Sequence, residues 1–214
     1  MTGIKFGDIH SDTLGLSWLG VFTLSPPSVV IKHVNIPGRN GSLDYSQALT
    51  GYVIYESRDI TMEFELETES NDEYIEKISK VMNLLHGQRM MVIADIEPDY
   101  QWDCRLNVED DRKSRRHSVV TITGTAYPYK RKTTDTVVEQ TVTDAVTEIT
   151  CSNLAEPVIP TIETSASMQI KFGNKTFNVQ EGTHTLDILF MAGENVLTVT
   201  GPGTIKITYR EGSL

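Results

Sequence analysis

Residues 58–69, Arg-Asp-Ile-Thr-Met-Glu-Phe-Glu-Leu-Glu-Thr-Glu, alternate apolar and polar side chains with great regularity. Successive side chains of a β-strand point to opposite faces of the sheet, so this pattern predicts a strand with one buried and one wet face. The wet face carries Glu63, Glu65 and Glu67. A row of carboxylates also suits a metal ion, but glutamates spaced in this way on a strand are usually solvated, and we expect no metal here.

The same period of two recurs on both sides of this segment. Further strand signals in the first 130 residues lie at 29–34, 51–55, 89–93, 102–108 and 118–126. The polar stretch Glu109–His117 lies between two of them, which predicts a hairpin tip. Its Arg115 and Arg116 adjoin acidic residues, so a solvated loop is favoured over a nucleic-acid site.

One segment follows the helical period instead. Ser70-Asn-Asp-Glu73 matches a capping box, in which the Ser70 hydroxyl accepts from the Glu73 amide and the Glu73 carboxylate accepts from the Ser70 amide. Apolar residues at spacings of three and four follow, and Gly87 is a typical helix stop. We therefore predict one α-helix over about residues 72–86.

The composition changes after Tyr129, and we place a domain boundary near Lys130. Short strand signals separated by tight turns follow it, at 169–172, 176–180, 183–189, 195–200 and 204–210. Strands at this spacing indicate an antiparallel β-sandwich and not a parallel sheet. The sequence thus predicts a mainly β protein with domains at residues 1–130 and 131–214.

Composition and charge exclude several classes of protein. The 214 residues carry 19 Lys and Arg against 29 Asp and Glu, a net charge of −10 that disfavours nucleic-acid binding. No apolar run approaches the ~20 residues of a membrane span, and the N-terminus resembles no secretory signal, so we expect a protein made in the cytoplasm without membrane insertion. Cys104 and Cys151 lie far apart, and we expect two reduced thiols.

The chain contains no recognisable catalytic motif, and we expect no enzymatic activity, no catalytic residue and no cofactor. Residues 37–41, Pro-Gly-Arg-Asn-Gly, lack the Lys-Ser/Thr of a phosphate-binding loop and predict a tight turn with left-handed Gly and Asn. The five histidines fall on separate elements without ligand spacing. Asp99 and Asp103, beside aromatic residues, are the best candidates for a sugar cleft, although an aromatic turn entering a strand is the simpler interpretation.

The order of several segments resembles the distal tail protein (Dit) family of long-tailed phages, the siphoviruses. Residues 4–16, Ile-Lys-Phe-Gly-Asp-Ile-His-Ser-Asp-Thr-Leu-Gly-Leu, and 34–44, Val-Asn-Ile-Pro-Gly-Arg-Asn-Gly-Ser-Leu-Asp, resemble its N-terminal half, which closes on Ala-Tyr-Pro at 126–128. Residues 153–157 and the ending Ile-Thr-Tyr-Arg-Glu-Gly-Ser-Leu at 207–214 resemble its galectin-like domain. Residues 137–150 align least well and are interpreted as a linker.

The resemblance implies a structural virion protein of the phage tail tip, or baseplate hub. Its N-terminal domain would be a β-sandwich-like ring domain with one α-helix, and its C-terminal domain a galectin-like β-sandwich that projects outward. Six copies would form a ring that joins the tail tube protein to the tail-associated lysin or fibre hub protein, with the tape measure protein as a further neighbour. DNA would pass through the channel without specific binding.

Charge is compatible with such a channel, because carboxylates repel a polyanion. Six copies at −10 each would carry −60, and residues 1–130, with 13 basic and 19 acidic side chains, are acidic by themselves. The candidates for lining the channel are Glu63, Glu65 and Glu67. The candidates for the subunit interface are Gly38, Arg39, Asn40, Gly41, Asp44, Arg115 and Arg116.

Two other functions remain open. A carbohydrate-binding module that recognises host cell-wall sugars needs an exposed aromatic ring for stacking. Residues 131–214 contain no Trp, and we expect Phe172, Phe190 and Tyr209 to lie in the core, which leaves Phe177. A hydrolase that opens the cell wall needs a localised acid or nucleophile, which the sequence does not reveal.

Overall fold

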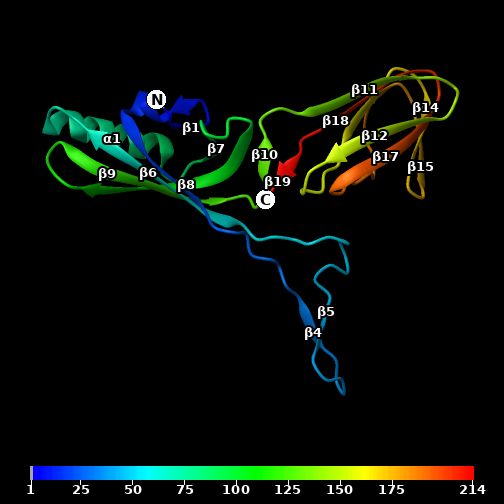
Figure 1. Ribbon diagram of the computed structural model, residues 1–214, viewed down its shortest axis with the longest axis horizontal. Coiled ribbons are helices and arrows are strands. Elements are labelled where there is room, and N and C mark those ends of the chain that lie inside the picture. The colour runs from blue at the N-terminus through cyan, green and yellow to red at the C-terminus, as the bar shows by residue number, and fades with distance from the viewer. Residues whose placement is uncertain (1) are drawn as a thin grey trace. The chain divides into compact units, whose positions relative to one another are not determined.

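The computed structural model describes residues 2–214 and divides after Pro128 into two compact units (Figure 1). We call them the N-terminal unit and the C-terminal unit and describe each by itself. Each unit has its own hydrophobic core. No helix in the described residues is long and apolar enough to span a membrane.

The N-terminal unit is built on one antiparallel sheet with the order β2-β1-β7-β8-β9-β6-β3. A short 3₁₀ helix, Ser11–Leu14, links β2 to β3. The strands are β1 (Ile4–Phe6), β2 (Ile9–His10), β3 (Leu16–Leu24), β6 (Arg58–Glu67), β7 (Arg89–Ala94), β8 (Tyr100–Arg112) and β9 (His117–Ala126).

Strand β6 has the alternation predicted for it. Ile60, Met62, Phe64 and Leu66 are fully buried, while the glutamates between them face outward. The sheet curls around this core, because the ring of Phe22 on the edge strand β3 lies 5.0 Å from the ring of Trp102 on β8, centroid to centroid. The predicted hairpin is confirmed as well, with β8 and β9 joined by a turn at residues 113–116.

Helix α1 (Asn71–Leu85) covers part of this core with Tyr74, Val81 and Leu85. Ser70 caps it as predicted, accepting a hydrogen bond from the Glu73 amide at 3.2 Å. The Glu73 carboxylate accepts chiefly from the amide of Glu69 at 2.8 Å, and the predicted hydrogen bond from the amide of Ser70 is the weaker of the two. The helix ends at Leu85, and the predicted stop, Gly87, follows with a φ of +74°, which favours glycine.

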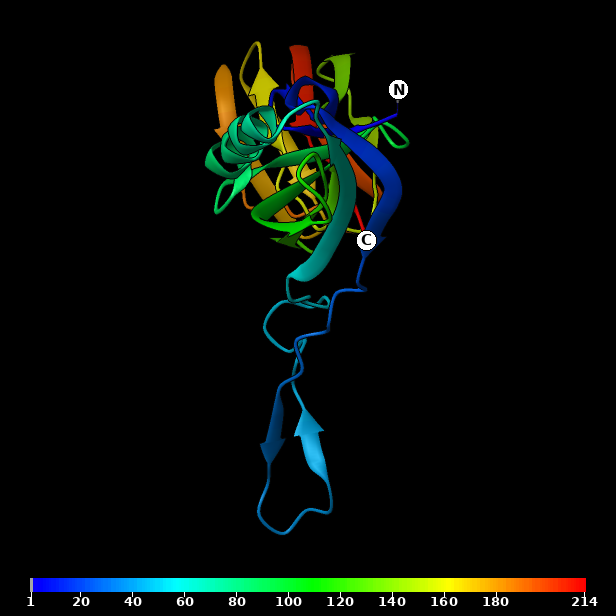
Figure 2. The same cartoon turned by 90° about the vertical axis from the view of Figure 1, so that its left-hand side faces the viewer.

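The segment between β3 and β6, residues 25–57, is an extended arm that ends in the hairpin β4 (His33–Asn35) and β5 (Ser42–Asp44) (Figures 1 and 2). The strands predicted at 29–34 and 51–55 are largely wrong, since a single bridge, Val29 to Tyr55, joins those two stretches. Their β-forming residues have no neighbouring sheet to join, and propensity alone does not make a strand.

The C-terminal unit is the predicted antiparallel sandwich. Its two four-stranded sheets have the orders β11-β18-β13-β16 and β12-β17-β14-β15, and the short strands β10 and β19 pair with each other. The strands are β10 (Lys130–Lys132), β11 (Thr136–Val142), β12 (Thr147–Asn153), β13 (Thr161–Thr164), β14 (Met168–Phe172), β15 (Lys175–Val179), β16 (Gly182–Thr185), β17 (Gly193–Thr200), β18 (Gly203–Tyr209) and β19 (Gly212–Ser213).

The linker interpretation of residues 137–150 is wrong. This stretch holds most of β11 and the start of β12, which pair with β18 and β17 along their length. Val142, Ile149 and Cys151 from these strands are buried in the core of the C-terminal unit. These threonine-rich strands have no Gly or Pro to mark their ends in the sequence. Their pattern therefore resembles that of a linker.

Candidate functional site

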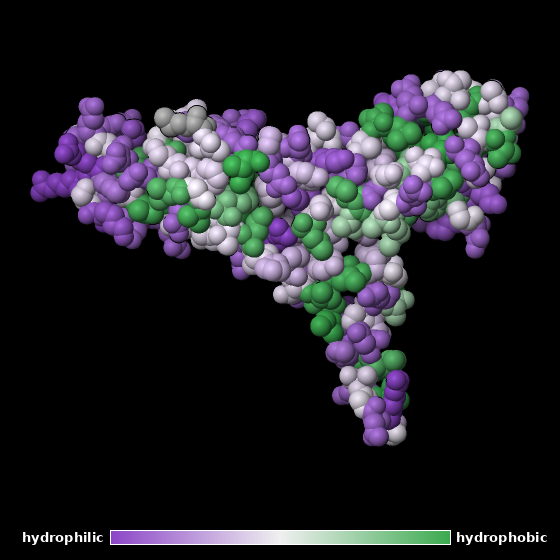
Figure 3. Space-filling model, viewed as in Figure 1, coloured by the Kyte–Doolittle hydropathy of each residue, from purple (hydrophilic) through white to green (hydrophobic). Residues whose placement is uncertain are grey.

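The arm, residues 25–57, is the most unusual surface of the N-terminal unit. None of its residues is buried, yet it carries a series of exposed large apolar side chains (Figure 3). Their exposed fractions run from 36 % for Tyr45 to 91 % for Leu49, and the set is Val29, Ile31, Val34, Ile36, Leu43, Tyr45, Leu49 and Ile54. Contiguous exposed apolar surface of this kind marks an interaction site.

The arm is held mainly by its own backbone and by one serine. The amide of Val30 donates to the carbonyl of Ile54 at 2.9 Å, and the hydroxyl of Ser46 accepts from the amide of Lys32 at 2.7 Å. Asp44 in turn accepts from the hydroxyl of Ser46 at 2.6 Å and from its amide at 2.9 Å, and these two hydrogen bonds lower the pKa of Asp44. An isolated two-stranded hairpin is marginally stable in water, so the arm lacks the packing that would hold it in place alone.

Sequence reasoning missed the apolar surface of the arm. Its apolar residues resemble those of ordinary strands, and burial cannot be read from such a short run. The available signal is the pair Pro26-Pro27, because proline cannot donate to a sheet ladder and argues against a central strand.

The tip of the arm contains the first group of predicted interface residues. Gly38 and Gly41 have φ values of +82° and +77°, which confirms the expected left-handed glycines. Asn40 does not share that conformation, because none of the described non-glycine residues has a positive φ. Arg39 and Asn40 are exposed at the tip. The tip therefore presents a polar end beyond the apolar flanks.

Arg115 and Arg116 lie on the β8–β9 turn, away from the arm. Arg116 donates to the carbonyl of Glu69 at 3.3 Å, and the neighbouring Arg112 donates to the side chain of Asn71 at 2.6 Å and stacks over Tyr74. Strand β6 begins at the arm and ends opposite His117, beside this turn. The structure thus places the two groups of predicted interface residues at opposite ends of one strand and does not bring them together.

The three predicted channel residues share one face of β6, as expected. Glu63 and Glu65 are half-buried and Glu67 is exposed. On the neighbouring strand β9, Thr121, Val119 and His117 lie opposite them in register. Oε1 of Glu65 lies 3.2 Å from Nε2 of His117, so this face is more than a row of solvated carboxylates.

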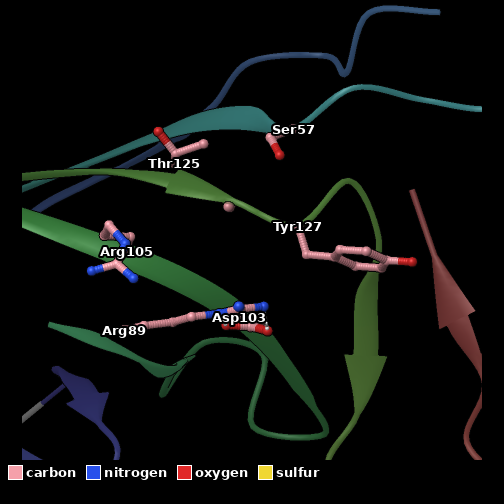
Figure 4. A pocket seen from close by; sticks show the side chains of 7 residues that line it. Ser57, Arg89, Asp103, Arg105, Thr125 and Tyr127 are labelled. Carbon is pink, nitrogen blue, oxygen red and sulfur yellow. Dashed lines mark hydrogen bonds and ion pairs between the residues drawn. The ribbon is translucent and has the colours of Figure 1, made fainter. Parts of the chain in front are cut away.

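A hollow of about 430 Å³ lies on the outer face of the N-terminal unit. Asp103 is the one carboxylate that lines it, and Arg89 holds both oxygens of that group at 2.8 and 2.6 Å, which raises the pKa of Arg89 (Figure 4). Its lining residues are Ser57, Arg89, Asp103, Arg105, Thr125, Ala126 and Tyr127.

At the predicted sugar cleft beside Asp99 and Asp103, Trp102 offers no platform for a sugar ring. Trp102 is 1 % exposed and faces the core, on the opposite side of β8 from Asp103. Sugar recognition by ring stacking needs an accessible aromatic face. For Trp102 the structure confirms the simpler interpretation, an aromatic stretch that enters a strand.

The four aromatic rings of residues 131–214 pack in or against the core of the C-terminal unit, as predicted for Phe172, Phe190 and Tyr209. Phe190 and Tyr209 are buried with their ring centroids 5.2 Å apart, edge to face. The Tyr209 hydroxyl donates to the carbonyl of Ser152 at 2.6 Å, and burial raises the pKa of Tyr209 to about 12. Phe172 and Phe177 are half-buried against the same core. These four rings are therefore committed to packing.

Comparison with known proteins yields a match in structure and none in sequence. No family model and no curated protein matches the sequence. Among solved structures, SPP1 Dit (gp 19.1), described as a paradigm of the hub adsorption apparatus in phages that infect Gram-positive bacteria, is similar with a TM-score of 0.71. The likeness covers 100 % of both chains at 15 % sequence identity. The chain therefore has the fold of a phage Dit protein over its whole length.

Proposed function

We propose that this chain is a structural component of a phage virion, located at the tail tip. It forms a homo-hexameric ring that joins the tail tube protein to the tail-associated lysin or fibre hub protein, beside the tape measure protein, and lets DNA pass. The observation that carries this proposal is the full-length likeness to SPP1 Dit, a hub protein. The same likeness supports a role in assembly and not in catalysis.

The arm provides the means of assembly. A ring with head-to-tail contacts requires two different surfaces on each subunit, and the rotation between copies must close. The arm and the β8–β9 turn lie at the two ends of β6, as such contacts require. The apolar side chains of the arm would be buried against the next copy, which compensates for the packing that the arm lacks in a single chain.

Charge supports the passage of DNA. Each chain carries a net charge of −10, and an acidic lumen repels the phosphate backbone and prevents adhesion. Glu63, Glu65 and Glu67 stay our candidates for the lumen because they share one outward face. The C-terminal unit would be the outward galectin-like domain. The four aromatic rings of residues 131–214 pack in or against its core, which argues against sugar binding.

Light scattering coupled to size-exclusion chromatography tests the proposed role of the arm. The full chain is expected to elute with the mass of six chains of 23.9 kDa. The double variant Ile31→Ser, Leu49→Ser removes two exposed apolar side chains and is expected to elute as a monomer. Each chain of the variant should keep its fold, because neither side chain is buried within one chain.

Val146→Ser is the matched control. Val146 is 70 % exposed but belongs to the C-terminal unit, so this variant should keep the mass of six chains. A wild-type chain that stays monomeric at high concentration contradicts the ring. An arm variant that keeps the mass of six chains contradicts the assigned role of the arm.

A further inference from the structure

We propose that Glu65, Glu67 and His117 form a binding site for a divalent transition-metal ion of the Zn²⁺ class. The site lies on the outer face of the N-terminal sheet and is contained in one chain, so it does not depend on the proposed ring. One ligand atom from each of these three side chains lies within 4.8 Å of the other two.

The register of two strands creates this arrangement. Glu65 and Glu67 are two positions apart on β6 and therefore point to the same face. His117 opens β9 directly opposite Glu67 and diagonal to Glu65. Residues opposite each other on paired strands have Cβ atoms about 5 Å apart, so three side chains from two strands can converge on one point.

One ring nitrogen of His117, a side chain that is 34 % exposed as a whole, gives a second indication of a ligand. Its Nε2 atom is shielded from solvent and makes no hydrogen bond of acceptable geometry with any described residue, although Oε1 of Glu65 lies only 3.2 Å away. Buried polar atoms without a partner are rare in folded proteins and call for an explanation. A metal ion between the imidazole and the carboxylates would satisfy this nitrogen.

No cation of the protein neutralises these carboxylates fully. Glu67 has no basic partner among the described residues, and β3 places the neutral Ser17 opposite Glu65 on the other side of β6. The guanidinium of the nearby Arg116 is engaged with the carbonyl of Glu69. Two carboxylates facing one imidazole thus leave a net negative site suited to a divalent ion.

The ligand set selects the kind of ion. An imidazole nitrogen favours Zn²⁺ and similar transition metals, whereas Mg²⁺ prefers oxygen ligands throughout. Tetrahedral ligands about 2.05 Å from Zn²⁺ lie about 3.4 Å from each other. The ligand atoms lie within 4.8 Å of one another, so the side chains need to close by at most about 1.4 Å. Three protein ligands leave the fourth position open to water or to a group from another protein.

His10 provides a matched comparison within the same unit. Its imidazole also lies between two carboxylates, with Nδ1 3.6 Å from Asp12 and Nε2 3.2 Å from Asp95. These carboxylates flank opposite ring nitrogens and cannot share one ion with a single nitrogen. His10 instead caps the 3₁₀ helix, because its Nδ1 accepts from the amide of Asp12 at 3.3 Å, whereas His117 directs one nitrogen at two carboxylates.

Isothermal titration of the full chain with ZnCl₂ tests the proposal. We expect one Zn²⁺ per chain, with affinity reduced at least tenfold in His117→Ala and in Glu67→Gln. Glu63→Gln and His10→Ala should bind as tightly as wild type. Glu67 is exposed and Gln has the same shape as Glu, so Glu67→Gln should fold normally. If His117→Ala fails to fold, the Zn²⁺ affinity of Glu67→Gln tests the proposal.

Two further measurements separate this site from a diffuse acidic surface. Co²⁺ in place of Zn²⁺ should give a visible absorption band that is lost in His117→Ala, and MgCl₂ should bind at least tenfold more weakly than ZnCl₂. Absence of Zn²⁺ binding, binding unchanged in both His117→Ala and Glu67→Gln, or equal affinity for Mg²⁺ would each overturn the proposal.

Discussion

Two buried glutamates, Glu156 and Glu211, bind side chains at the start of the C-terminal unit. The Glu156 carboxylate is almost completely buried and accepts from Nε of Arg131 at 2.9 Å. Glu211, equally buried, accepts from Lys132 and Thr136. A Cβ on Gly212 would clash with the Glu156 side chain, so glycine is required beside this pair. These contacts join the first and last strands of the unit, β10 and β19.

The pair between Glu156 and Arg131 should contribute measurably to stability. Removing one partner of a buried pair costs about 3–5 kcal/mol, and we reduce this to about 1–3 kcal/mol for Glu156→Gln because Arg131 is 39 % exposed. The exposed pair of Glu163 and Lys206 is the control, and Glu163→Gln should cost less than about 0.5 kcal/mol. Urea unfolding measures both, and equal losses would contradict the assignment.

The two buried cysteines should make the free energy of unfolding fall as the pH rises above about 9. Both thiols are buried and unbridged, as predicted, and burial raises the pKa of Cys104 to about 12 and that of Cys151 to about 11. In the unfolded chain these thiols ionise near the ordinary value of 9.0. The stabilisation is therefore complete below about pH 9 and is lost as the pH rises toward the folded values.

The variant Cys104→Ala measures this effect. Between about pH 9 and 11 the free energy of unfolding of wild type should fall with pH more steeply than that of the variant. The difference between the two slopes should be about 1.4 kcal/mol per pH unit. Denaturant unfolding at several pH values gives both slopes. Identical slopes would show that Cys104 is accessible in the folded state, as would rapid reaction of the native thiol with a disulfide reagent.

Elements defined by local patterns could be predicted from the sequence. The alternation in β6 and the cap of α1 are properties of a few neighbouring residues, so both were predicted close to their observed bounds. The arm and β11 could not be predicted, for opposite reasons. The β-forming residues of the arm have no sheet to pair with, while β11 gains its structure from β18, more than sixty residues away in the sequence.

Helix α1 should lose stability without its cap. Ser70 satisfies the amide of Glu73, which has no partner within the helix. Ser70→Ala should therefore reduce the free energy of unfolding by about 1 kcal/mol. Ser28→Ala, at an exposed position of the arm, is the control and should change it by less than about 0.5 kcal/mol. Chemical denaturation compares the two, and a neutral Ser70→Ala would contradict the role of the cap.

At the scale of the whole molecule, the candidate sites depend on long-range pairing. Strand β6 pairs with β3, from which the arm separates it in the sequence, and with β9, which follows only after helix α1 and two more strands. The register of β6 with β9 places Glu67 opposite His117. Sequence alone placed Glu63, Glu65 and Glu67 on one face, but it treated His117 as part of a separate loop. The convergence of Glu65, Glu67 and His117 is therefore a product of register, which local periodicity does not specify.

The central claim is that copies of this chain close into a ring through the arm. Negative-stain electron microscopy of the purified full chain tests it most directly, because symmetry and a central channel are visible in averaged end views. The account predicts six-fold rings with a central hole. Uniform particles of single chains, at a concentration where self-association would be complete, would contradict it.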